Sequence, residues 1–136
     1  MKNKFESFKE RVIHLRNLCE GELVEYKNKV AETDFYNLTY NIKWGFQDLV
    51  RQEFLYKKYS ELAKPIEDPE CDWKENILRW IEEDLTRNQE QINRLGIMNS
   101  TGFMHNAFGL FELQAQAQWM EELKQMIRLL KREDKS

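Results

Sequence analysis

Proline, glycine and cysteine are scarce in this sequence, with two prolines, five glycines and two cysteines among 136 residues. So few chain breakers argue against a disordered linker, in which proline and glycine are abundant. Two cysteines are too few for a disulfide framework, and Cys19 and Cys71 lack the spacing of metal ligands. We therefore expect free thiols, with Cys19 as a small core residue.

The sequence also has no long apolar run and little excess of charge of one sign. Charged residues make up 33% of the chain, and no stretch has the apolar length of a signal peptide or a membrane-spanning helix. With 21 basic and 24 acidic side chains the net charge is −3, so no overall positive field attracts nucleic acid. These features predict a cytoplasmic protein with neither a membrane nor a nucleic acid as partner.

The hydrophobic residues, 41% of the total, follow helical spacing between a few breaks. Nothing alternates with period two for long enough to be a strand. We predict one all-α domain over 1–136, an up-down-up-down antiparallel bundle of four long helices. The alternative is a pair of elongated helical hairpins that complete a core by dimerisation. The predicted helices span about 3–32, 34–63, 72–95 and 103–132, with loops at 64–71 and 96–102.

The first and third predicted helices each carry one regular apolar stripe. In the first, eight apolar residues between Phe5 and Val30 recur every three or four positions, as in coiled-coil packing. The third opens with Asp72-Trp73-Lys74-Glu75, which has the pattern of a capping box, and closes at Gly96 in the usual C-terminal position.

The second and fourth predicted helices carry more apolar surface than a minimal bundle uses. The second has an extra stripe on its far side. The first half of the fourth points away from its second half, so either the helix kinks near Gly109 or this half faces a partner. These faces predict a homo-oligomer or partner-protein interface. Its predicted residues are Tyr40, Trp44, Leu55, Tyr59, Leu62, Phe103, Phe108 and Phe111.

Polar side chains from three predicted helices converge at one end of the bundle. The second and fourth helices begin there with nearly uncharged halves, and the third ends there with Asp84 and Asn88 on its apolar stripe. Three explanations compete: a satisfied polar layer that fixes helix register, an interface, or a small-molecule pocket for a nucleotide-like anion. The candidate pocket residues are Tyr36, Tyr40, Asn41, Asp84, Asn88, His105 and Asn106.

The sequence contains no complete catalytic or metal-binding motif. Neither His14 nor His105 belongs to the Glu-x-x-His pattern of di-iron bundles, and two histidines are too few for a hemerythrin-type centre. Neither Glu82-Glu83-Asp84 nor Glu121-Glu122 is followed by the further carboxylates that helical magnesium-dependent pyrophosphatases use. The glycines are scattered and form no phosphate-binding loop. We therefore expect no catalytic residue, no metal and no cofactor.

The sequence thus predicts a small cytoplasmic helical protein that self-associates and binds a partner protein as a regulator or inhibitor. The alternative is a bundle that binds or processes a nucleotide-like anion at its polar end. The abundance of Lys, Asn, Glu, Phe, Tyr and Ile, all encoded by AT-rich codons, favours a bacterial or phage origin.

Overall fold

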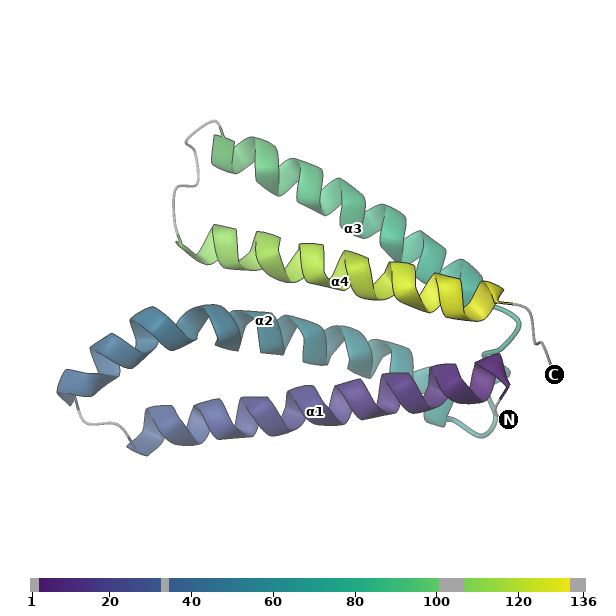
Figure 1. Cartoon of the computed structure of the whole chain (residues 1–136), viewed down its shortest axis with the longest axis horizontal. Coiled ribbons are helices and arrows are strands. Elements are labelled where there is room, and N and C mark those ends of the chain that lie inside the picture. Colours follow the sequence, from purple (N-terminus) through teal and green to yellow (C-terminus); the bar gives the residue numbers. More distant parts are fainter. Residues whose placement is uncertain (1–2, 33–34, 101–106, 133–136) are drawn as a thin grey trace.

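The computed structural model describes the backbone of residues 3–32, 35–100 and 107–132 and the side chains of 3–29, 31, 48–94 and 111–132. All four elements within these ranges are α-helices, and none is a strand (Figure 1). The predicted all-α bundle of four helices is confirmed. None of the described helices combines the length and apolar character that a membrane crossing requires. The helices are α1 (Lys4–Glu32), α2 (Phe35–Glu67), α3 (Ile77–Ser100) and α4 (Ala107–Lys131).

The helices pack as two hairpins, α1 with α2 and α3 with α4. The hairpins are joined mainly by contact between α2 and α4, and α1 also touches α4. Among the described residues the backbones of α2 and α3 do not approach closely. The colours in Figure 1 show that α1 begins and α4 ends at the same end of the molecule. At the opposite end the two hairpins diverge.

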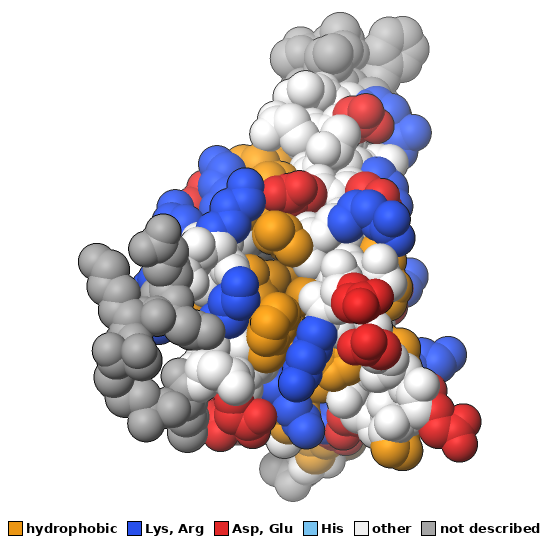
Figure 2. Space-filling model, turned by 90° about the vertical axis from the view of Figure 1, so that its right-hand side faces the viewer, with side chains coloured by type: hydrophobic (Ala, Val, Ile, Leu, Met, Phe, Trp, Pro, Cys, Tyr) orange, Lys and Arg blue, Asp and Glu red, His pale blue; other side chains and the backbone are white. Residues whose placement is uncertain are grey.

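The core contains side chains from all four helices, so the hairpins complete a core within one chain. Spacings of three and four residues put these side chains on the inner face of each helix. Figure 2, seen from the end where α1 begins, shows a strip of hydrophobic side chains between polar and charged ones. The largest fully buried side chains are Trp119, Phe8, Ile77, Ile81, Leu123, Met126 and Val12.

Helix α2 extends beyond its predicted end at residue 63 and continues to Glu67, with Pro65 in its last turn. Ala63 and Ile66 are both buried in the core. A proline so close to a helix end removes only one backbone hydrogen bond, which this burial outweighs. The predicted loop at 64–71 is therefore shifted along the chain, and the segment between α2 and α3 spans residues 68–76.

Helix α3 begins at Ile77, five residues after its predicted start, so the capping box at Asp72 is not its N-terminus. The reason is the burial of Trp73. Its ring centroid lies 5.9 Å from that of Phe5 and 5.8 Å from that of Phe8, on α1. This docking holds the segment before α3 outside the helix. The first helical bond then runs from the Trp80 amide to the Asn76 carbonyl.

Two further boundaries differ from the prediction. Helix α3 continues through Gly96 to Ser100, so Gly96 is not a C-cap and the predicted loop does not begin at residue 96. A glycine costs only about 1 kcal/mol inside a helix, which does not force an end. Helix α4 is one helix from Ala107 onward and contains Gly109. Its predicted start at 103 falls outside the described residues.

Candidate functional site

Two polar residues, Asp84 and Asn88, lie on the apolar face of α3. They follow Ile77 and Ile81 at spacings of four, three and four residues, which places all four on one side of the helix. The two isoleucines are fully buried, and Asn88 is only 3% exposed. Helical periodicity therefore directs these polar groups into the bundle, where each needs a partner.

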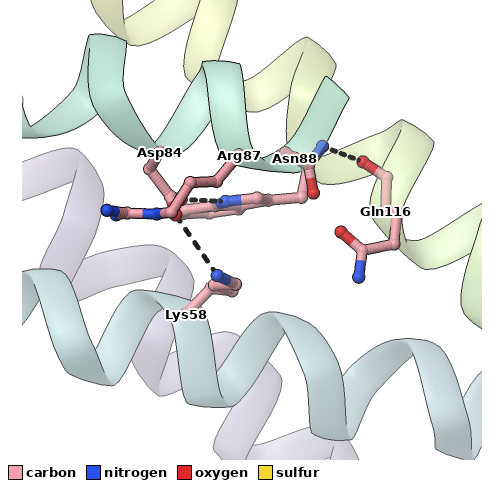
Figure 3. Close-up of polar contacts among 6 residues, drawn as sticks. Lys58, Asp84, Arg87, Asn88 and Gln116 are labelled. Atoms are coloured by element: carbon pink, nitrogen blue, oxygen red, sulfur yellow. Dashed lines mark hydrogen bonds and ion pairs between the residues drawn. The ribbon is translucent and has the colours of Figure 1, made fainter. Parts of the chain in front are cut away.

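The Asp84 carboxylate joins three helices. One oxygen, Oδ2, accepts a hydrogen bond from Trp119 Nε1 of α4 at 2.7 Å. The other, Oδ1, lies 3.4 Å from Lys58 Nζ of α2 and 3.3 Å from Arg87 Nη2 of α3 (Figure 3). Because the Asp84 side chain is 17% exposed, these charged hydrogen bonds are partly shielded from water.

A second carboxylate extends this network across the bundle to α1. The Trp119 ring packs edge-on against Tyr59 of α2, with centroids 5.1 Å apart. Burial together with the nearby Glu122 carboxylate raises the pKa of Tyr59. Glu122 in turn pairs with Arg11 of α1 at 2.9 Å. We call Arg11, Lys58, Tyr59, Asp84, Trp119 and Glu122 the polar network.

Asn88 lies one turn beyond Asp84 and is only half satisfied. Its Nδ2 donates to the Gln116 carbonyl of α4 at 2.7 Å, while its Oδ1 has no hydrogen-bond partner among the described side chains (Figure 3). The Oε1 of Gln52, a residue of α2 that is 8% exposed, is also buried without a partner. Two buried amide oxygens without partners are costly in a bundle of this size.

The structure tests only part of the predicted pocket. Asp84 and Asn88 share one face of α3, as described above. The other candidates are not placed together: Tyr36, Tyr40 and Asn41 belong to α2 but their side chains are outside the described ones, and His105 and Asn106 are outside the described residues. The predicted interface residues Trp44, Phe103 and Phe108 also lie outside the described side chains.

The predicted far-side stripe of α2 is wrong for Leu55 and Tyr59, which are 3% and 2% exposed. Both belong to the core, because α2 packs against α4 as well as α1. Leu62 and Phe111 are half-buried. At Leu55 and Tyr59, the second apolar face of α2 is therefore used within the chain.

The exposed apolar side chains lie instead on α1, where the sequence prediction did not place them. Leu18 is 50% exposed and Val24 is 54% exposed; no other large hydrophobic side chain of the described set is as open. Val24 belongs to a line of exposed, uncharged residues whose positions differ by three, four, three, four and three, and Leu18 lies beside this line. We call this line the outer stripe of α1: His14, Asn17, Gly21, Val24, Asn28 and Ala31.

The outer stripe differs from the exposed face of the described part of α2. Over residues 53–64 that face is charged and alternates in sign, with Glu53, Lys57, Glu61 and Lys64. Such alternation is typical of a face in contact with water. The spacing of the outer stripe is present in the sequence. The core stripe of the same helix is more strongly apolar and was the one that the sequence pattern predicted.

The described side chains contain no group of three or more His, Cys, Asp or Glu placed to hold a metal ion. An open depression of about 240 Å³ lies on α1, lined by Glu22, Glu25, Tyr26 and Lys29. Its volume is below the ~300–1,000 Å³ of most small-molecule sites.

We expect Asn88→Leu to raise the free energy of unfolding by about 1 kcal/mol, because it removes a buried amide oxygen without a partner and keeps the branched shape of the side chain. Urea unfolding monitored by circular dichroism measures the change. Asn93→Leu, at an exposed position of the same helix, is the control and should shift the midpoint little. A loss of stability in Asn88→Leu would mean that the bond to the Gln116 carbonyl outweighs the unpaired oxygen.

Cys19 should make the folded chain less stable in alkali. Burial, reinforced by Glu22, raises its pKa from 9.0 to about 11. Between these pH values the unfolded chain loses the thiol proton while the folded chain keeps it, so stability is full below pH 9 and falls as pH rises toward 11. The expected loss is about 2 kcal/mol. It is measured by urea unfolding at pH 8 and pH 11, and Cys19→Ala should lose correspondingly less; equal losses would contradict the prediction.

No protein family matches this chain, and neither a curated protein nor a solved structure is similar to it. The chemistry of its own residues is therefore the basis on which function is inferred.

Proposed function

We propose that this chain is a non-enzymatic interaction protein that self-associates and, as a regulator or inhibitor, binds a partner protein. The observation that carries the proposal is the outer stripe of α1, beside which Leu18 is half exposed and within which Val24 is more than half exposed. Apolar groups gathered on an otherwise uncharged helix face are typical of protein–protein contacts.

The polar network supports the same proposal because its polar groups already pair with one another. Each Asp84 oxygen is already engaged, by Trp119 on one side and by Lys58 and Arg87 on the other. A general base or a ligand-binding carboxylate needs an accessible oxygen. The network therefore favours a structural role that fixes the register of the helices, and the interaction surface lies elsewhere.

A second candidate function, binding of a small molecule at the polar end, is favoured by one observation. The unpaired oxygens of Asn88 and Gln52 are hydrogen-bond acceptors inside the bundle. They suit a ligand that presents N–H or O–H donors. This candidate is weaker because it depends on two atoms, whereas the outer stripe extends along most of α1.

Native mass spectrometry and sedimentation of the purified chain test the proposal. We expect an assembly heavier than the chain mass of 16.6 kDa and with no other added mass. The double variant Leu18→Glu/Val24→Glu should weaken the assembly at least about tenfold, because it introduces charge on the open face. The control Gln89→Glu/Gln118→Glu places the same charges on exposed positions of α3 and α4 and should leave it unchanged.

Two outcomes would contradict the proposal. A chain that is monomeric at every concentration would remove self-association. A co-purifying small molecule that is released on unfolding and is lost in Asn88→Leu would favour the second candidate instead.

A further inference from the structure

Gly21 sits in the middle of the outer stripe, where nothing in the described part of the chain requires a glycine. A Cβ built at Gly21 would meet no atom of the described residues within 4 Å. Inside a helix glycine is less favourable than alanine by about 1 kcal/mol, and here no intrachain contact explains that cost. A residue without a side chain at the centre of an exposed helix face permits another backbone to approach closely.

The outer stripe has the spacing of a helix-pairing seam. Steps of three, four, three, four and three over residues 14–31 are the a and d positions of a heptad repeat. The occupant that matches this spacing along its length is another helix. Residues 13, 20 and 27 then flank the stripe on one side, and residues 18 and 25 flank it on the other.

We propose that the outer stripe binds the outer stripe of a second copy of this chain, with the two α1 helices antiparallel. The inference rests on the proposed function and specifies its geometry. Because a and d positions meet in antiparallel pairs, Gly21 of each copy lies opposite Val24 of the other, so the glycine makes room for the valine. Asn17 then lies opposite Asn28, where two amides can exchange hydrogen bonds.

The flanking charges select the antiparallel direction. In an antiparallel pair, flanks of the same kind meet, so Glu20 of each copy lies near Lys27 of the other and two attractive pairs form. In a parallel pair Glu20 would lie near Glu25 of the other copy and two like-charged contacts would form. Glu20 and Lys27 are exposed in the single chain, so these charges are available to a second copy, whereas Glu25, also exposed, already pairs with Lys29 at 3.3 Å. On the opposite flank, Leu18 packs beside the methylenes of Glu25.

The length of the stripe sets the strength of the contact. Residues 14–31 span about 26 Å of helix at 1.5 Å per residue. One helix pair of this length buries less than the ~800 Å² per partner of a standard interface, so the dimer should be reversible, with a Kd of about 10–100 μM. Its affinity should also fall at high salt, because the Glu20–Lys27 pairs are at the rim.

Sedimentation equilibrium on charge-swap variants of the full chain tests the arrangement. Glu20→Lys and Lys27→Glu each place like charges together at both symmetric positions, so each should raise the Kd at least about fivefold. The double variant Glu20→Lys/Lys27→Glu restores opposite charges and should return the Kd to within about twofold of the original. The matched control is Glu53→Lys on the outward face of α2, which should have no effect.

Every other outcome overturns the proposal in a recognisable way. Tighter association of Glu20→Lys would mean a parallel pair. A dimer that ignores both swaps and also ignores Gly21→Leu, which fills the crossing point with a good helix former, would mean a different interface while self-association stands. A chain that stays monomeric up to about 1 mM overturns the dimer and the proposed self-association together.

Discussion

Replacing Trp119 by alanine is expected to lower the free energy of unfolding by about 3–5 kcal/mol, the range for a large aromatic residue removed from a core. The side chain is 1% exposed and contacts both hairpins. It packs edge-on against Tyr59 and donates its indole N–H to Asp84. Alanine would therefore leave a cavity and an unpaired carboxylate oxygen at once.

Chemical unfolding followed by far-UV circular dichroism measures this loss. Trp119→Phe keeps most of the ring but removes the N–H donor, so it should cost about 1–3 kcal/mol and remain folded if Trp119→Ala does not. Gln118→Ala, at the exposed neighbouring position, is the control and should stay within about 0.5 kcal/mol. A cost below about 1 kcal/mol for both Trp119 variants would show that the network is not formed in solution.

Asp84→Leu should be nearly as damaging, with an expected loss of about 2–4 kcal/mol. The reason is not the surface pair with Arg87, which is 66% exposed and contributes little. The loss comes from the partly buried Lys58 ammonium and the Trp119 N–H, which lose their shared acceptor. Asp84→Asn keeps an acceptor oxygen and removes the charge, so it should cost less than Asp84→Leu.

Glu83→Ala is the matched control, since Glu83 is an adjacent carboxylate whose side chain is 55% exposed. A double-mutant cycle between Asp84→Asn and Trp119→Phe isolates their interaction, which should be about 1 kcal/mol or more. Additive costs would indicate that the two groups act independently and that the 2.7 Å bond contributes little.

The fold class could be predicted because local and long-range signals agree. Two prolines in one segment and apolar residues at helical spacing leave few alternatives to a four-helix bundle. The burial of Cys19 on the inner face of α1 was predictable for the same reason. Helix ends were less predictable: the capping pattern at Asp72 was overridden when Trp73 docked onto Phe5 and Phe8, a contact distant in sequence.

The location of the exposed apolar surface could not be read from helix faces alone. The stripe containing Leu55 and Tyr59 would be exposed if α2 packed against a single helix. In the structure α2 packs against two helices, α1 and α4. Periodicity identifies a face but not the element that covers it. For the same reason the outer stripe of α1 was not predictable, because its polar and small residues resemble an ordinary solvated face.

The order in which contacts form gives the polar network a kinetic consequence. Pairing within each hairpin joins residues that are near in sequence, whereas Arg11 and Glu122 are 111 residues apart. Loop-closure entropy favours the local pairings first, so the hairpins should form early and dock late. Interactions made after the transition state slow unfolding without speeding folding. The link from Arg11 to Glu122 should therefore govern the lifetime of the folded chain more than the time it takes to fold.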